Sequence, residues 1–241
     1  QFENDVLELA KKGATSFSIS LEHWSDPFKL ETILNKQQLD NLRIGWDFII
    51  DIDSSDLEHS KIAASLVVNA LNIHKIRNLS VKYSGNRGFH IAVPYSSFPG
   101  VINGQETRFL FPEGARTMAL YLREFIQEDL RIKLKNPNPF SLVDIDTIMF
   151  SSRHLFRSPY SINEKSGLSS IPISSDNIIN FNPVMAQLEN VNTNVKFLPE
   201  LEKSREAAKL FVAAFDWKSS YKPIFEVKVK QDEPKKFYNP K

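Results

Sequence analysis

The stretch F-I-I-D-I-D at residues 48–53 is the first informative part of this sequence, because an apolar run there ends in two acidic residues. With the residues before it, this stretch predicts a buried strand over residues 44–53 that runs into a polar turn at 54–56. Side chains alternate between the faces of a strand that rises about 3.3 Å per residue, so Asp51 and Asp53 share a face with Cα atoms roughly 6 to 7 Å apart. Their carboxylates are candidate ligands for one or two divalent cations.

Two acids at a strand end have a second explanation, which is that they only solvate a turn, and the spacing alone leaves both open. Asp47 lies at an even offset from both acids and shares their face, yet it is deeper in the strand. We expect Asp47 to cap a backbone group or to pair with a buried basic side chain.

The segment S-G-N-R-G-F-H at residues 84–90 adds groups suited to an anion. Gly85 and Gly88 allow backbone amides to approach a phosphate closely. Three side chains add hydrogen-bond donors: Ser84, Arg87 and His90. This pattern is typical of a triphosphate site, although a hairpin turn with a chance arginine and histidine is the alternative.

A third segment supplies another acid and more cationic groups. V-D-I-D at residues 143–146 is followed by R-H-L-F-R-S-P-Y at residues 153–160. These residues lie about fifty positions after the glycine-containing loop, so only folding can bring the segments together.

The remaining pattern predicts helices and strands that alternate irregularly, which indicates an α+β or mixed α/β fold. The predicted helices cover residues 3–12, 28–39, 57–73, 115–130 and 201–215. The further predicted strands cover residues 16–20, 79–83, 89–93, 142–150 and 169–173, with a loop over 94–113. We expect one catalytic domain over residues 1–222, and a C-terminal strand and tail, or a linker to a further domain, over 223–241.

Composition narrows the class of protein. The chain has 241 residues, of which 41% are hydrophobic, and it contains no cysteine, so disulfides and thiolate zinc sites are excluded. The net charge of +1 means that contact with a nucleic acid requires a local basic groove. The longest apolar run, over residues 62–73, is broken by Asn69 and Asn72, and we expect no membrane segment.

Taken together, the three motifs resemble those of the archaeo-eukaryotic primase superfamily and are most similar to those of the catalytic small subunit of primases. D-I-D follows an apolar strand, S-G-N-R-G-F-H comes next, and an acid at a strand end precedes R-H-L-F-R-S-P-Y-S-I-N-E-K-S-G-L at residues 153–168. The matched blocks cover roughly residues 44–173. The resemblance implies a primase-polymerase core in which helices flank central β-sheets.

The resemblance also implies roles for individual residues. In that family two acids of the first motif and one of the third hold the catalytic ions, which carries over to Asp51, Asp53 and either Asp144 or Asp146. The spacing does not choose between the last two, and the implied cofactor is a pair of Mg²⁺ or Mn²⁺ ions. The residues implied for nucleotide binding are Ser84, Gly85, Arg87, His90, Arg153, His154, Arg157 and Lys165, although Arg153 could equally reach the template or a carboxylate.

Two departures from the family pattern limit this transfer. Asn163 stands where the third block commonly has a histidine, so one phosphate contact is weakened or replaced. The absence of cysteine excludes the zinc knuckle of many small subunits, so the resemblance implies a zinc-free member. We expect a cytoplasmic, nucleoid-associated protein of a prokaryote or an archaeal mobile element.

The leading hypothesis is a template-directed nucleotidyltransferase that makes or extends an RNA or DNA primer. The partners implied are a single-stranded DNA template, a ribo- or deoxynucleoside triphosphate, and a primase large subunit or a fused C-terminal domain. One alternative is a catalytically weak primase fold that binds nucleic acid or scaffolds a replisome. A less favoured alternative is an aspartyl phosphohydrolase, which leaves residues 84–90 without a role.

Overall fold

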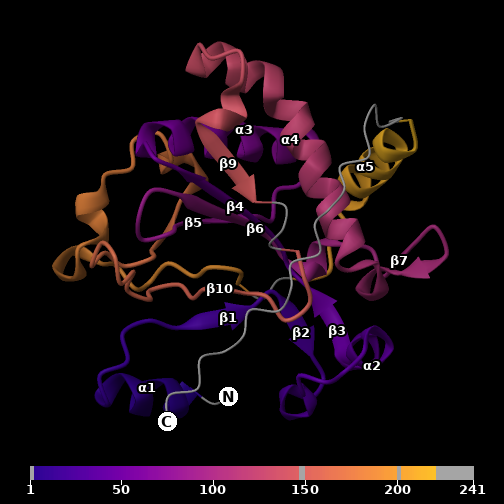
Figure 1. Cartoon of the computed structure of the whole chain (residues 1–241), viewed down its shortest axis with the longest axis horizontal. Helices are drawn as coiled ribbons and strands as arrows, with labels where there is room; N and C mark the ends of the chain where they lie inside the picture. Colours follow the sequence, from indigo (N-terminus) through magenta and orange to yellow (C-terminus); the bar gives the residue numbers. More distant parts are fainter. Residues whose placement is uncertain (1–2, 147–149, 200–201, 221–241) are drawn as a thin grey trace, which may run out of the picture.

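The computed structural model describes residues 3–146, 150–199 and 202–220 (Figure 1). The C-terminal strand and tail expected over residues 223–241 lie outside the described residues. The chain forms a mixed α+β fold with a central antiparallel sheet flanked by helices, as predicted (Figure 1). No helix of the described part of the chain is long and apolar enough to cross a membrane.

Five strands in the order β11-β5-β6-β4-β9 form the central sheet, and every neighbouring pair is antiparallel. In chain order they are β4 (Phe48–Ser54), β5 (Ser80–Tyr83), β6 (Phe89–Val93), β9 (Val143–Asp146) and β11 (Pro172–Ile173). The acids of the first and third motifs therefore lie on adjacent strands although about ninety residues separate them.

Helices cover the sheet face that is opposite to the acids. That face carries buried apolar side chains, among them Ile50, Ile52 and Ile145. Helix α3 (Leu57–Ile73) packs against β4 and β6, α4 (Glu113–Leu134) packs on α3, and α5 (Ala208–Ser220) packs on α4 (Figure 1). The helix predicted over residues 57–73 is thus α3, which packs on the face of β4 opposite to its acids.

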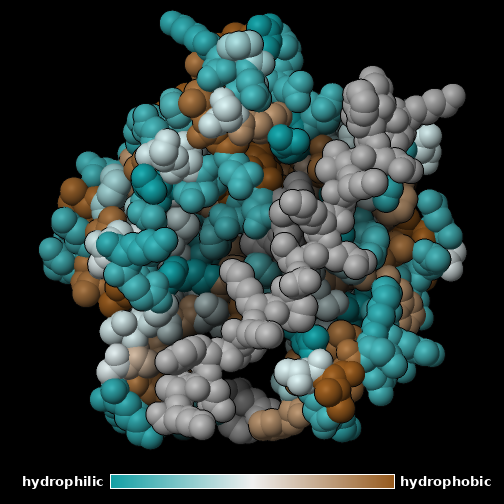
Figure 2. All heavy atoms as spheres, in the orientation of Figure 1, coloured by the Kyte–Doolittle hydropathy of each residue, from teal (hydrophilic) through white to brown (hydrophobic). Residues whose placement is uncertain are grey.

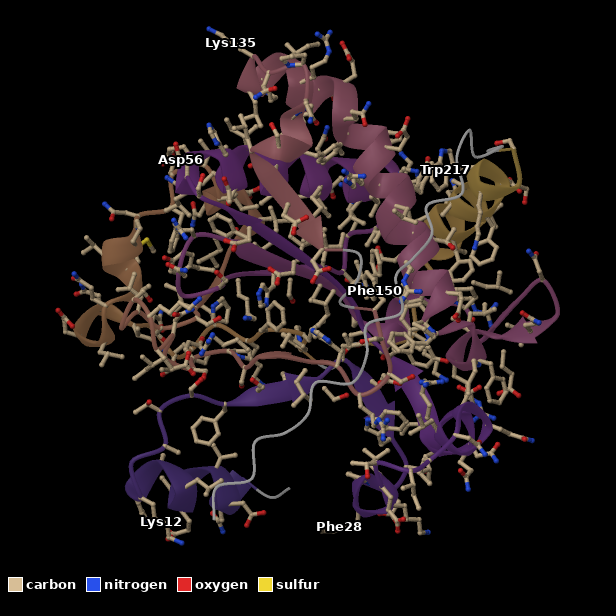
Figure 3. The ribbon with its side chains drawn as sticks, in the orientation of Figure 1. Lys12, Phe28, Asp56, Lys135, Phe150 and Trp217 are labelled. Atoms are coloured by element: carbon tan, nitrogen blue, oxygen red, sulfur yellow. The ribbon has the colours of Figure 1, made fainter. Side chains whose placement is uncertain are left out.

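A second layer lies across the other face of the sheet. It contains the antiparallel pair β1 (Ser18–Ser20) and β10 (Leu155–Arg157), and the pair β2 (Glu22–Trp24) and β3 (Arg43–Trp46) (Figure 1). In Figure 3, side chains of both layers occupy the interval between the central sheet and β10. The face in Figure 2 is largely hydrophilic, with apolar residues in smaller groups.

One predicted strand is wrong in its extent. Residues 44–53 form two strands of different sheets, β3 and β4, which are separated at Asp47. The Asp47 amide donates to the Leu21 carbonyl at 2.8 Å, and its carboxylate accepts from the Tyr95 amide at 2.9 Å. Asp47 thus redirects the chain between the two sheets, which agrees with a capping role.

Other boundaries differ from the pattern where local caps decide them. The helix expected over 28–39 is a 3₁₀ turn at Pro27–Lys29 and α2 at Lys36–Leu42, because Asn35 and Gln38 form a capping box that starts a new helix. The helix expected from residue 201 begins at Ala208. Helix α1 (Glu3–Lys11) agrees with its prediction, and the loop over 94–113 contains a short hairpin of β7 (Val101–Ile102) and β8 (Gln105–Glu106).

Candidate active site

The four acids of the two D-I-D segments share one face of the central sheet. Strand β4 lies between β6 and β9, and its Asp51 is opposite both Asp146 on β9 and His90 on β6. Asp53 is opposite Asp144. Directly opposite residues of antiparallel strands point to the same side, so the acids and the imidazole gather on one patch.

Gly88 allows the loop over residues 84–88, called the phosphate loop after the ligand predicted for it, to pass against the acids. A Cβ atom at this position would lie 2.2 Å from the carbonyl oxygen of Ile52 and 3.2 Å from Oδ1 of Asp53. Real side chains do not tolerate the first distance. Glycine is therefore required here by close approach rather than by a turn.

The loop over residues 84–88 is held by its own hydrogen bonds. The Ser84 amide donates to the Gly88 carbonyl at 3.0 Å, and Ser84 Oγ accepts from the Gly88 amide at 3.2 Å. Gly85 has a φ of +93°, which favours glycine, and its carbonyl accepts from the Ser166 hydroxyl. The loop is thereby tied to the segment that follows Arg157.

A cleft of about 250 Å³ opens between the two layers. Its floor comes from the central sheet and the phosphate loop, and consists of Asp51, Asp53, Ser84, Asn86 and His90. Its roof comes from β10 and the residues on either side of that strand, and consists of His154, Leu155, Phe156, Arg157 and Asn163. Acids, hydroxyl, imidazoles and guanidinium thus face one space, which suits an anionic ligand held through cations.

Burial and charge act in opposite directions on the two central groups. The pKa of His90 lies below its ordinary value because the imidazole is buried and near the ammonium of Lys82, although Asp51 opposes this. Burial of Asp51 favours its protonated form, but His90, Lys82 and His154 together hold its pKa below the ordinary value. Asp51 is therefore an ionised carboxylate at neutral pH.

The carboxylates fit a hard cation by their chemistry. Asp144 is exposed, but partial desolvation raises its pKa, and so do the negative charges of Asp146, Asp51 and Asp53. Within residues 3–146, 150–199 and 202–220, no three His, Asp or Glu side chains converge closely enough to hold a metal ion. Like charges repel, so bringing these oxygens together requires a cation, and Mg²⁺ and Mn²⁺ prefer such oxygen ligands.

Three residues predicted for nucleotide binding lie away from the cleft. The Arg87 side chain is exposed, and its Nη1 donates to the Ser55 carbonyl at 3.3 Å. The Arg153 guanidinium donates to the Glu31 carbonyl at 2.9 Å. Lys165 is exposed and does not line the cleft.

Arg157 does line the cleft, and three groups fix its guanidinium. Nη1 donates to Ser16 Oγ and to the Ile162 carbonyl, both at 2.7 Å, and Nη2 contacts Glu164 Oε2 at 2.8 Å. The Arg157 and Ser16 side chains lower the pKa of Glu164 to about 2. The roof cation is therefore held in one orientation.

Asn163 stabilises a turn. Its Oδ1 accepts from the Lys165 amide at 3.0 Å, and its carbonyl accepts from the Gly167 amide at 2.8 Å. A Cβ at Gly85 would lie 2.9 Å from the Asn163 Cβ, so the turn packs on the phosphate loop. The position that differs from the family pattern thus shapes the roof.

The motifs did not single out every lining residue. Asn86, Leu155 and Phe156 line the cleft, and Lys82 lies buried beside it, with burial lowering the pKa of its ammonium to about 7. Lys82 precedes Ser84 by two residues, and residues at even spacing in an extended segment share a face. This spacing is the sequence feature that could have placed Lys82 near the site.

Sequence comparison identifies distant relatives of this chain. Over 164 residues the chain is 30% identical to the DNA primase small subunit PriS of Pyrobaculum aerophilum, which covers 54% of this chain and 53% of that protein. The chain is a distant homologue of archaeal DNA primase small subunits. Homologous PriS proteins of Pyrobaculum calidifontis and Pyrobaculum arsenaticum are 26% identical over 168 residues and 29% identical over 167 residues. The resemblance seen in the three motifs is thereby confirmed.

These matches cover only part of the chain and part of each relative. The chain spans about half the length of the curated relatives it matches, at 53% to 55%. No family model matches the chain. Among solved structures, the polymerase domain of Mycobacterium tuberculosis Ligase D in complex with DNA has a TM-score of 0.40 and 15% identity, covering 84% of this chain and 58% of that one.

Proposed function

We propose that this chain is a template-directed nucleotidyltransferase that makes or extends a primer on single-stranded DNA. The observation that carries the proposal is the row of acids on adjacent strands in a homologue of primase small subunits: Asp51 and Asp53 line the cleft beside Ser84, and Asp144 and Asp146 lie opposite them on β9 without lining the cleft. Four carboxylates beside donors for phosphate suit phosphoryl chemistry on a nucleoside triphosphate.

The floor residues of the cleft hold the reacting groups in this proposal. Asp51 and Asp53, with Asp144 or Asp146, would hold the divalent ions. Bound there, Mg²⁺ or Mn²⁺ would lower the pKa of the attacking 3′-hydroxyl and neutralise charge on the leaving pyrophosphate. The Ser84 hydroxyl and His90 imidazole orient the triphosphate from below, and the fixed Arg157 guanidinium contacts it from above.

The chain's residues contribute mainly by placement. In this proposal the triphosphate lies between the floor and the roof of the cleft, near the acids of the floor and the guanidinium of the roof. We expect a primase large subunit or a fused domain to complete the template path, and we expect the protein to act in the cytoplasm with chromosomal or mobile-element DNA.

The test is primer extension by the wild-type chain and an isosteric double variant, D51N with D53N. The assay contains a single-stranded template with and without a primer, labelled ribo- or deoxynucleotides, and Mg²⁺ or Mn²⁺. Each lost carboxylate removes several kcal/mol of charge stabilisation, so incorporation should fall by at least about a hundredfold. The matched control is D56N. Asp56 is a nearby aspartate that caps the N-terminus of α3, and asparagine caps a helix equally well.

The outcomes separate the candidate functions. Full activity of the double variant, with a circular dichroism spectrum like that of the wild type, would refute the proposal. Binding of Mn²⁺ and nucleotide without incorporation under any of these conditions indicates a non-catalytic primase fold. Trapping of an aspartyl-phosphate during turnover indicates the phosphohydrolase instead.

A further inference from the structure

Lys82 occupies an unusual position for a lysine. It lies in the middle of β5, its side chain is fully buried, and it is opposite His90 across the β5–β6 pair. His90 is in turn opposite Asp51, which is opposite Asp146. The ammonium therefore belongs to the row of side chains that crosses the sheet beneath the cleft, although Lys82 does not line the cleft itself.

The ammonium of Lys82 is held by a hydroxyl and by aromatic rings. Nζ donates to Ser170 Oγ at 2.7 Å, and Ser170 Oγ donates to the Tyr83 carbonyl at 2.8 Å. Nζ also lies 5.7 Å from the ring centroids of both Phe156 and Phe197. These contacts connect the sheet to the layer above it.

Two of these partners, Phe156 and Ser170, belong to the roof or to its support. Phe156 lines the cleft, and its ring is 6.0 Å from the His90 ring in an edge-to-face arrangement. Ser170 exchanges backbone hydrogen bonds with the segment after Arg157, because its amide donates to the Ser161 carbonyl at 2.8 Å and its carbonyl accepts from the Tyr160 amide at 2.6 Å. A movement of Ser170 would thus be transmitted to the roof.

Stability alone does not explain a lysine at this site. Transferring an ammonium from water to a protein interior has an effective cost of several kcal/mol, and the hydrogen bond to Ser170 and the negative charge of Asp51 recover only part of it. Methionine has nearly the same length and would fill the same space without that penalty. A lysine here is consistent with a requirement of the site rather than of the core.

We propose that Lys82 is a positioning residue for the nucleotide site, which sets the roof at its working distance from the acids through Ser170 and Phe156. This inference rests on the proposed function. Loss of the ammonium releases the roof, so Arg157 no longer meets the triphosphate in the correct place. Lys82 itself does not touch the substrate.

The experiment compares K82M, S170A and the double variant with the wild-type chain. Three quantities are measured for each protein: the urea midpoint of unfolding, the dissociation constant for a fluorescent nucleotide with Mn²⁺, and kcat and KM for primer extension. The matched control is K61M, because Lys61 is also buried but lies on α3 and pairs with Glu58 at 2.7 Å.

We expect K82M to unfold at the same or a higher urea concentration than the wild type. Nucleotide affinity and kcat should each fall by about 10- to 100-fold, as for other residues that orient a site from behind. S170A should change both in the same direction by less, and the double variant should be no worse than K82M, because both changes break one linkage. K61M should retain wild-type affinity and kcat.

Three results would overturn the inference. The first is a K82M protein with wild-type affinity and kcat but an earlier unfolding midpoint, which makes Lys82 a core residue. The second is additivity of K82M and S170A, which separates Lys82 from the roof. The third is a wild-type chain that binds no nucleotide, which also refutes the proposed function. A wild-type chain that binds nucleotide but does not incorporate it refutes only the proposed function, and the affinities then decide the role of Lys82.

Discussion

The imidazole of His90 lies directly across the β4–β6 pair from Asp51, with Nε2 at 3.3 Å from Asp51 Oδ1. The other ring nitrogen, Nδ1, is buried and has no hydrogen-bond partner among the described residues. The Phe156 ring covers the same imidazole from the roof. His90 therefore lies in the cleft floor beside an acid of the proposed metal site, and its Nε2 contact orients that acid.

Replacing His90 should show which of its nitrogens matters. We expect H90A to lower primer extension by about 10- to 100-fold, because a partner that orients a metal-binding carboxylate is lost. H90Q should recover part of the activity, since the glutamine amide can reach Asp51 at a similar length, whereas H90N should not. Steady-state rates at saturating Mn²⁺ measure this, and equal rates for H90Q and H90N would contradict it.

Gly88 should not tolerate even one added methyl group. We expect G88A to reduce the free energy of unfolding by about 1–3 kcal/mol, because its Cβ would meet the Ile52 carbonyl and force β4 and the loop apart. G100A is the matched control, as the space around Gly100 is open. Urea denaturation measures both, and a G88A midpoint equal to that of the wild type would refute the close approach.

The two acids of β9 should differ in importance. Asp146 is half-buried and opposite Asp51, whereas Asp144 is exposed and lies near Arg123. We therefore expect D146N to weaken Mn²⁺ binding and primer extension more than D144N does. Calorimetric titration with Mn²⁺ measures the affinity of each variant for the ion. If D144N loses more affinity than D146N, direct binding is assigned to Asp144.

The pair of His23 and Asp47 should make stability depend on pH. His23 Nε2 lies 2.9 Å from Asp47 Oδ2, and this hydrogen bond raises the pKa of His23 although burial opposes it. A histidine whose folded pKa exceeds its unfolded value of about 6.5 stabilises fully below that value, and this contribution is lost as the pH rises through the folded pKa. The contribution is small because the His23 side chain is 43% exposed.

We expect the difference in urea midpoint between the wild type and H23Q to be largest near pH 5.5 and to shrink as the pH rises. The same comparison in a D47N background supplies the control, since the charge partner is then absent. A difference that grows with pH, or one that persists unchanged without Asp47, would show that the pair does not act in this way.

The sequence predicted correctly those helices and strands that are specified by residues within them or directly beside them. The stripe of α3 and the strands on either side of the phosphate loop agree with the structure because hydrophobic period and turn residues specify them directly. Prediction failed where tertiary contacts decide. Asp47 breaks a continuous apolar pattern because the Leu21 carbonyl and Tyr95 amide hold it, and Leu155–Arg157 becomes a strand only by pairing with Ser18–Ser20.

The candidate site divides in the same way. The residue types and their order along the chain, through their resemblance to the primase motifs, predicted that the acids, the glycine-containing loop and the basic block belong to one site. Which of these residues meet depends on the tertiary structure, because the hydrogen-bond register across β6, β4 and β9 decides which side chains lie opposite one another. The fold also brings Arg157 to the cleft, whereas Arg87 and Arg153 bind backbone carbonyls elsewhere. The buried link from Lys82 to Ser170 joins residues 88 positions apart, a relationship that no local pattern contains.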